Sequence, residues 1–216
     1  MGTRRAIFLF ALLCGASAGG CAPVATGGAW KLTIYVTAVE DFHHGSRQTV
    51  LGCKTLECKF GREYLGHYPA TFVKAVKDQG TGRITSGAFA RQFLNWSIDV
   101  GYWLDRAPRD ARGGTLQPWV SAAADPSVPM DTHVTIAHCG VDLETGNKID
   151  ERICKQLRAG RWIVRDRFTV GKVGRWLDLY IGDEHGPGHA ESPFAVSTRD
   201  AKVVLDKKPP STPASK

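Results

Sequence analysis

Two aspartates stand in contexts where a carboxyl group could do chemistry. Asp178 interrupts an apolar run at residues 176–181 (WLDLYI), a composition typical of a β-strand. A carboxyl group there is poorly solvated unless it faces a cleft, and desolvation favours the protonated form that a general acid needs. The alternative is that Asp178 lies on the solvent side of a half-exposed strand, as polar residues on alternating strands usually do.

Asp166 strengthens the first interpretation. It lies in the preceding predicted strand, residues 162–168, and the connection to the strand of Asp178 contains Gly171 and Gly174. Glycines allow tight turns and the close approach of a ligand to the backbone. Two acids on neighbouring strands, joined by such a connection, indicate a possible acid/base site.

Short β-strands are the elements expected to position these acids. Stretches rich in β-branched and aromatic residues, bounded by Gly, Pro and Asp, predict strands at 32–37, 71–76, 133–136, 162–168, 176–181 and 201–205. One helix is predicted at about 148–158, because Ile149, Ile153 and Leu157 recur every fourth residue. The polar stretch 101–114 predicts a loop or insertion. The pattern indicates a mainly β protein built on a closed or nearly closed barrel.

Several segments resemble the three-aspartate (3D) domain, which occurs in the membrane-bound lytic transglycosylase A family and related cell-wall proteins. Residues 124–132 (ADPSVPMDT), which contain Asp125, are similar to its A-x-D-P-x-x-I-P-x-G-T segment. Residues 164–166 (VRD) followed by 176–180 (WLDLY) resemble its D-x-G-x-x-I-x-G-x-x-I-D-x-F segment. Residues 78–83 (DQGTGR) are similar to the Q-G-S-G motif of the transglycosylases. These are short motifs, which support a hypothesis about the family.

The resemblance implies a six-stranded double-psi β-barrel with loop insertions. The chain departs from the family pattern in two places: Phe168 or Thr169 stands where the family has a glycine after its second aspartate, and Asp131 replaces the glycine of Pro-x-Gly-Thr. The second, groove-forming domain of the full-size transglycosylases is expected to be absent or much reduced.

Roles for the three aspartates follow from the same resemblance. Asp178 matches the catalytic acid, which protonates the glycosidic oxygen between N-acetylmuramic acid and N-acetylglucosamine and then takes the proton of the muramyl C6 hydroxyl. Asp166 would tune or orient Asp178, since a nearby negative charge favours the protonated acid. Asp125 would hold a loop through hydrogen bonds to backbone N–H groups. This chemistry needs no cofactor and no metal.

Basic and aromatic residues near Asp166 are candidates for binding the substrate. They are Arg165, Arg167, Lys172 and Trp176. Arginine binds carboxylates well, and peptidoglycan stem peptides carry carboxylates. A solvated charged face, and a tryptophan that belongs to the core, are the commoner explanations for such residues taken singly.

Four of the six cysteines are expected to form disulfides. Of the three possible connectivities we favour Cys53–Cys58 and Cys139–Cys154, because each closes a short loop. A zinc site is the alternative for the first pair, but neither a CxxC nor an HxxxH spacing is present. Histidines in the predicted loops, at 43–44 and 185–189, are expected to be solvated.

The N-terminus has the order of a secretory signal. Arg4 and Arg5 precede an apolar segment at 6–13, which is too short to span a bilayer, and small residues follow. Residues 18–21 resemble a lipobox, so Cys21 is a candidate for acylation; the alternative is ordinary signal cleavage at residues 16–18 (ASA). We therefore divide the chain into a signal (1–20), a tether (21–30), the barrel domain (31–206, with core motifs at 120–184) and a disordered tail (207–216).

Charge and composition limit the functional class. The 216 residues carry 28 Lys and Arg against 21 Asp and Glu, and 43% are hydrophobic, which is a globular composition. Without the signal, 26 basic residues face 21 acidic ones, and a wall polymer or lipid headgroups suit this excess better than nucleic acid. We expect a monomeric periplasmic lipoprotein with transglycosylase-like activity; the alternative is a non-catalytic peptidoglycan-binding or scaffold lipoprotein.

Overall fold

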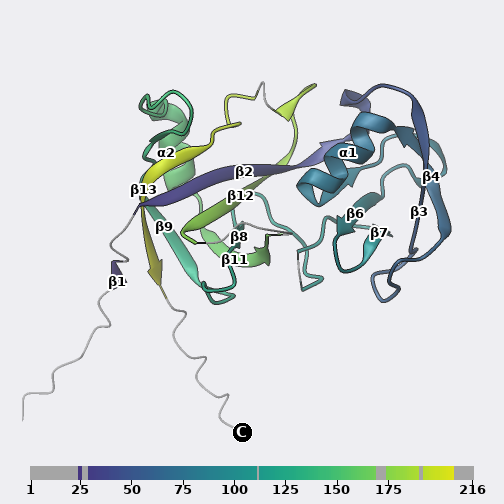
Figure 1. Ribbon diagram of the computed structural model, residues 1–216, viewed down its shortest axis with the longest axis horizontal. Coiled ribbons are helices and arrows are strands. Elements are labelled where there is room, and N and C mark those ends of the chain that lie inside the picture. Colours follow the sequence, from purple (N-terminus) through teal and green to yellow (C-terminus); the bar gives the residue numbers. More distant parts are fainter. Residues whose placement is uncertain (1–23, 26–28, 111, 169–173, 190–191, 207–216) are drawn as a thin grey trace, which may run out of the picture.

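The protein consists of a β-barrel and a lobe inserted into it (Figure 1). The computed structural model describes residues 24–25, 29–110, 112–168, 174–189 and 192–206. The proposed signal, Cys21, Lys172 and the tail from residue 207 lie outside the described residues. None of the helices within the described ranges is long and apolar enough to cross a membrane.

Six strands close the barrel. They are β2 (Trp30–Val39), β8 (Ser121–Ala124), β9 (His133–His138), β11 (Trp162–Arg167), β12 (Trp176–Asp183) and β13 (Thr198–Asp206). The ring runs β13–β9–β11–β8–β12–β2 and closes because β13 also pairs with β2. The pairs β2–β12 and β8–β11 are parallel, and the other pairs in the ring are antiparallel. The expectation of a mainly β, double-psi barrel is confirmed. Two short strands, β1 (Val24–Ala25) and β10 (Val141–Asp142), add to β13.

The barrel interior follows from the alternation of its strands. On β12, Leu177, Leu179 and Ile181 are buried in the main hydrophobic cluster, together with Ala122 and Ala124 of β8. Successive side chains of a strand point to opposite faces, so the residues between them lie on the outer face. Asp178 therefore lies outside the barrel core.

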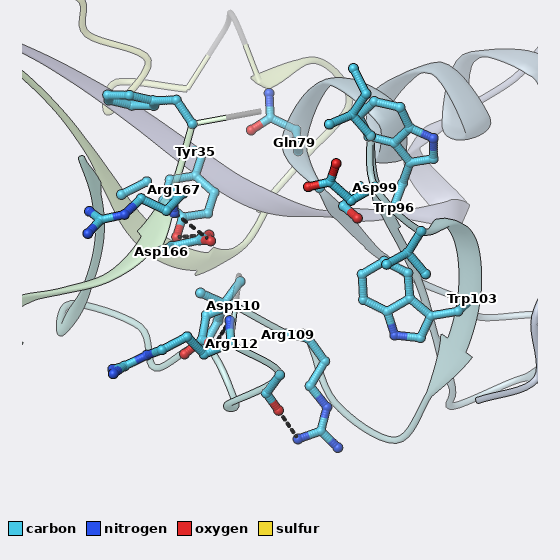
Figure 2. A pocket seen from close by; sticks show the side chains of 18 of the residues that line it. Tyr35, Gln79, Trp96, Asp99, Trp103, Arg109, Asp110, Arg112, Asp166 and Arg167 are labelled. Atoms are coloured by element: carbon cyan, nitrogen blue, oxygen red, sulfur yellow. Dashed lines mark hydrogen bonds between the residues drawn. The ribbon is translucent and has the colours of Figure 1, made fainter. Parts of the chain in front are cut away.

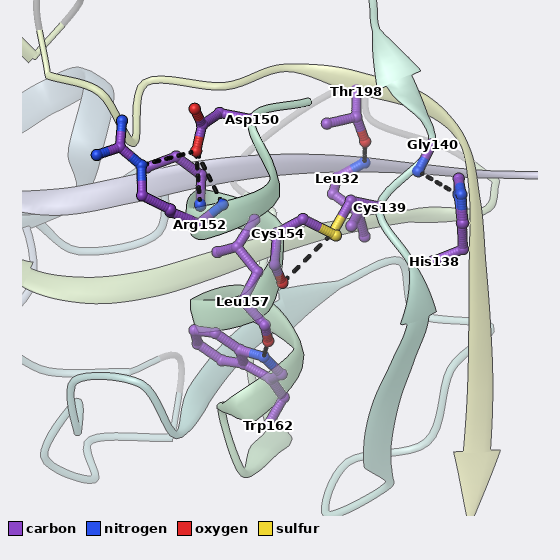
Figure 3. Close-up of a disulfide and its surroundings, with 11 residues drawn as sticks. Leu32, His138, Cys139, Gly140, Asp150, Arg152, Cys154, Leu157, Trp162 and Thr198 are labelled. Carbon is purple, nitrogen blue, oxygen red and sulfur yellow. Dashed lines mark hydrogen bonds and ion pairs between the residues drawn. A yellow bond between two sulfur atoms is a disulfide. The ribbon is translucent and has the colours of Figure 1, made fainter. Parts of the chain in front are cut away.

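Helix α2 (Glu151–Ala159) covers the barrel beside β9 (Figure 3). The predicted helix is confirmed, with its start moved to Glu151 because the side chain of Asp150 accepts hydrogen bonds from the backbone N–H groups of Arg152 and Ile153. The Cys139–Cys154 disulfide attaches the helix to the end of β9. A covalent loop of this size stabilises a protein by about 3 kcal/mol.

The inserted lobe (residues 40–105) is more regular than the loop insertion expected from the sequence. Its elements are η1 (Glu40–Phe42), β3 (Arg47–Gly52), β4 (Glu63–Pro69), α1 (Ala70–Gln79), β5 (Thr81–Arg83), η2 (Gly87–Phe89), β6 (Phe93–Ser97) and β7 (Gly101–Asp105). It has its own buried cluster, which includes Leu65, Phe72 and Leu94. Strand β2 connects the two parts, because its last residues leave the barrel and pair with β5. The Cys53–Cys58 disulfide lies in this lobe, so both expected pairings are confirmed and these thiols are not metal ligands.

Two sequence predictions in the lobe are wrong. Residues 71–76, predicted as a strand, belong to α1, because Phe72, Val73 and Val76 form one buried helix face. Six residues are too few for periodicity to separate the two alternatives. Residues 101–105, predicted as part of a polar loop, form β7, whose residues Tyr102, Trp103 and Leu104 pair with β6. The polar residues that suggested a loop belong to the connection that follows.

Candidate active site

A β-bulge places Asp166 on the outer face of the barrel. Val164 lies in the core, and simple alternation would turn Asp166 into the core as well. Instead, the register between β11 and β8 shifts after Val164, so that Asp166 lies opposite Ala123. Bulges redirect side chains in this way and are common beside active sites.

The two acids therefore belong to one row of outward-facing residues. Ala123 pairs with Asp166 on one side and with Asp178 on the other, and Asp178 pairs in turn with Thr33 of β2. Two strand spacings separate the backbones of the two acids, about 10 Å. This spacing is wide enough for a sugar ring to approach both carboxylates.

A cavity of about 720 Å³ lies over this row (Figure 2). Asp166, Asp178 and Tyr35 line its barrel wall, and Gln79, Trp96 and Asp99 line its lobe wall. Arg109, Asp110 and Arg112, from the connection between β7 and β8, line a third side. The cavity thus lies between the two hydrophobic cores, and both acids face it.

A chain of two hydrogen bonds orients the carboxylate of Asp178. The Thr33 hydroxyl lies 2.7 Å from Asp178 Oδ1, and the indole Nε1 of Trp176 lies 2.8 Å from the same hydroxyl. An indole N–H can only donate, so the Thr33 oxygen accepts from Trp176 and directs its single hydrogen to Asp178. The ammonium group of Lys31 lies 3.7 Å from the centre of the Trp176 ring and holds that ring in place.

Asp166 is held by a buried tyrosine. Tyr35 OH donates to Asp166 Oδ2 at 3.2 Å, and the backbone N–H of Arg167 donates to Oδ1 at 2.8 Å. Burial raises the pKa of Tyr35 well above its usual value, and the negative charges of Asp166 and Asp178 raise it further. Tyr35 therefore stays neutral and remains a hydrogen-bond donor to Asp166.

Asp125 lies below the surface and away from the cavity wall. It is 7% exposed, and its Oδ1 accepts the backbone N–H of Ser127 at 2.9 Å. Hydrogen bonds from Ser127 lower the pKa of Asp125. These contacts hold the turn that follows β8, the strand between the two acids.

The structure places only some of the candidate substrate-binding residues at the cavity. Arg167 lines the cavity beside Asp166, whereas Arg165 and Trp176 are absent from its lining among the described residues. Burial lowers the pKa of Arg167, and its guanidinium makes long contacts of 3.5 Å with the carbonyl oxygens of Ala124 and Asp125.

The sequence did not single out three residues of the site: Thr33, Tyr35 and Gln79. Thr33 and Tyr35 lie in a predicted strand. Every second residue of that strand is polar, and this pattern indicates a solvent-facing side that contains both. Gln79 was noticed only as part of a motif. Its Oε1 accepts the backbone N–H of Val36 at 3.0 Å, which connects the end of α1 to β2 beside the cavity.

Comparison with known proteins identifies solved structures of the same fold. No family model and no curated protein matches the chain. The structure of MltA from E. coli with bound chitohexaose superposes with a TM-score of 0.53 at 15% identity, covering 84% of this chain and 73% of that one. A membrane-bound lytic murein transglycosylase from Agrobacterium tumefaciens gives a TM-score of 0.50 at 11% identity, covering 82% and 73%.

This chain has the fold of those transglycosylases. At such identities the likeness concerns the fold alone, and it spans both the barrel and the inserted lobe because it covers more than four fifths of the chain. The lobe has a core of its own, and the expectation that the second domain is absent or much reduced stays a prediction.

Proposed function

We propose that this protein is a lytic transglycosylase-like enzyme that cleaves the β-1,4 bond between N-acetylmuramic acid and N-acetylglucosamine in peptidoglycan. The observation that carries the proposal is the row in which Asp166 and Asp178 flank Ala123 and face one cavity. A solved structure of the same fold contains chitohexaose, a glycan, which supports a glycan substrate here.

In the proposed reaction Asp178 acts first as an acid and then as a base. Its carboxyl proton passes to the glycosidic oxygen, the bond from that oxygen to muramyl C1 breaks, and N-acetylglucosamine leaves as an alcohol. The muramyl C6 hydroxyl then attacks C1 and gives its proton to the Asp178 carboxylate, which regenerates the acid. The product carries a 1,6-anhydro ring, and no water is consumed, so a second catalytic carboxylate is unnecessary.

The other site residues would support this cycle. The negative charge of Asp166, held by Tyr35, would stabilise positive charge at C1 in the transition state. Arg167 is our candidate for binding stem-peptide carboxylates. Arg165, Lys172 and Trp176 stay predicted substrate-binding residues, and Trp176 also contacts Thr33 and Lys31.

The two disulfides support an oxidising compartment, in agreement with export to the bacterial envelope. Acylation of Cys21, a monomeric state and periplasmic location remain part of the proposal. Labelling with a fatty-acid analogue, followed by replacement of Cys21 with serine, would test the anchor directly.

The reaction itself is tested with purified protein and peptidoglycan sacculi. We expect mass spectrometry to detect soluble muropeptides that end in 1,6-anhydro-N-acetylmuramic acid. Products with a free reducing end would indicate hydrolysis and overturn the proposed reaction. Binding to sacculi without soluble product would favour the alternative, a non-catalytic binding or scaffold protein.

The hydrogen-bond chain to Asp178 leads to a graded prediction. Thr33→Val removes the hydroxyl but keeps the shape, and we expect anhydro-product formation to fall about tenfold, the value of one hydrogen bond to a charged group. Thr33→Ser should retain most activity. Trp176→Phe should cost about threefold, because the Thr33 hydroxyl remains but is no longer oriented. Equal rates for Thr33→Val and Thr33→Ser would contradict this role.

A further inference from the structure

Phe60 combines high exposure with a conformation that large side chains rarely adopt. The residue is 64% exposed, the highest exposure among the large hydrophobic residues of the described chain. Its backbone φ is 49°, in the left-handed region that favours glycine. Such a residue is retained only where the surrounding structure imposes it, and these residues concentrate at binding sites.

The backbone on both sides of Phe60 is constrained by the neighbouring disulfide. Phe60 lies between Cys58, which is bonded to Cys53, and Gly61. A Cβ atom on Gly61 would lie 2.4 Å from the carbonyl oxygen of Gly52 and within 3 Å of both disulfide sulfurs, so only glycine fits there. The Phe60 N–H donates to the carbonyl oxygen of Val100 at 2.8 Å. The chain thus presents an exposed aromatic ring from a cross-linked support.

Phe60 lies at the rim of the cavity. The preceding residue, Lys59, lines the cavity, as do Ile98 and Val100 from the turn to which Phe60 is hydrogen-bonded. The ring passes over Gly101, where an added Cβ would lie 3.4 Å from Phe60 Cδ1. The aromatic surface is therefore continuous with the lobe side of the cavity.

We propose that Phe60 is a carbohydrate-binding platform, on which a sugar ring of the glycan strand stacks outside the cavity. The faces of a pyranose carry C–H groups, which are apolar and slightly positive, and they match the negative face of an aromatic ring. The proposal rests on the proposed function in taking the glycan as the ligand. It adds a site that Asp166 and Asp178 do not reach, and one that only a strand extending beyond the cavity would occupy.

A glycan fits this position better than a membrane surface. A membrane-binding tip pairs exposed apolar residues with an excess of basic ones. Residues 54–63 carry three basic side chains (Lys54, Lys59 and Arg62) and two acidic ones (Glu57 and Glu63), with Lys54 paired to Glu63 at 2.6 Å, so the excess is a single positive charge. An extended polymer whose sugar rings have apolar faces, and which leaves the cavity, is the ligand whose chemistry suits this rim.

Binding measurements test the platform. In an Asp178→Asn background, which prevents cleavage, we expect Phe60→Ala to weaken binding of long peptidoglycan glycan strands about tenfold and to leave binding of a single disaccharide unit unchanged. Phe60→Trp should bind the strands at least as well as the parent. Tyr64→Ala is the matched control, because Tyr64 is an exposed aromatic of the same lobe, 54% exposed, whose ring lies beside Phe89, and its neighbours Glu63, Leu65 and Phe89 do not line the cavity.

Each outcome decides the proposal. Unchanged strand binding by Phe60→Ala, or an equal loss in Tyr64→Ala, would overturn it, as would loss of binding to phosphatidylglycerol vesicles without any loss of glycan binding. Phe60→Gly removes the strain of the positive φ, so its melting temperature should be higher than that of Phe60→Ala. If the glycine variant is stable and still binds strands weakly, misfolding is excluded as the cause of the weak binding. If the parent protein yields no anhydro-product but Phe60→Ala loses strand binding, the platform stands and the proposed reaction fails.

Discussion

Asp178→Asn is expected to lower the formation of anhydromuropeptides about 1000-fold or more. The amide has the same shape and still accepts the Thr33 hydrogen bond, but it carries no acidic proton and does not take one from the muramyl hydroxyl. Because one group is proposed to serve both proton transfers, its loss removes both. Mass spectrometry of products released from sacculi measures this effect, with binding to sacculi measured in parallel.

The control for this variant is Asp183→Asn. Asp183 lies on the same strand but is paired with Arg83 at 2.8 Å and is absent from the lining of the main cavity in the described part of the chain. We expect it to cleave within a few-fold of the parent. If Asp178→Asn cleaves as well as the parent protein, the catalytic assignment is wrong, whatever the fold resembles.

The sequence predicted the barrel and singled out the two acids, Asp166 and Asp178, that line the cavity. The apolar run at 176–181 predicted strand β12 and marked Asp178 as the residue that interrupts it. Short-range signals also gave helix α2 and the two disulfides, since each depends on residues close together in the chain.

The geometry of the site depends on features that local patterns do not encode. The bulge after Val164 is such a feature: a regular strand would have turned Asp166 into the core, and only pairing with β8 shows the shift. Thr33 reaches Asp178 because β2 and β12 are parallel neighbours, although 145 residues separate them. The lobe was underestimated because its strands are short and its helix α1 also alternates as a strand does over six residues.

Asp166→Asn is expected to reduce anhydro-product formation about 100-fold, a typical cost of losing one electrostatic group at a transition state. The asparagine oxygen still accepts the Arg167 N–H and its NH2 group can donate to the Tyr35 oxygen, so the free energy of unfolding should change little. Asp166→Ala should lose as much activity and also about 1–3 kcal/mol of stability, because it leaves the buried Tyr35 hydroxyl without its acceptor. Product analysis and urea unfolding separate the two effects.

The double variant Tyr35→Phe/Asp166→Ala tests whether the loss of activity is independent of the loss of stability. Removing both partners takes away the unsatisfied hydroxyl, so most of the lost stability should return while activity stays low. Tyr35→Phe alone keeps the negative charge and should retain more activity than either Asp166 variant. Recovery of activity together with stability in the double variant would mean that Asp166 only supports the fold, and Asp178 would then act without a charged neighbour in its row.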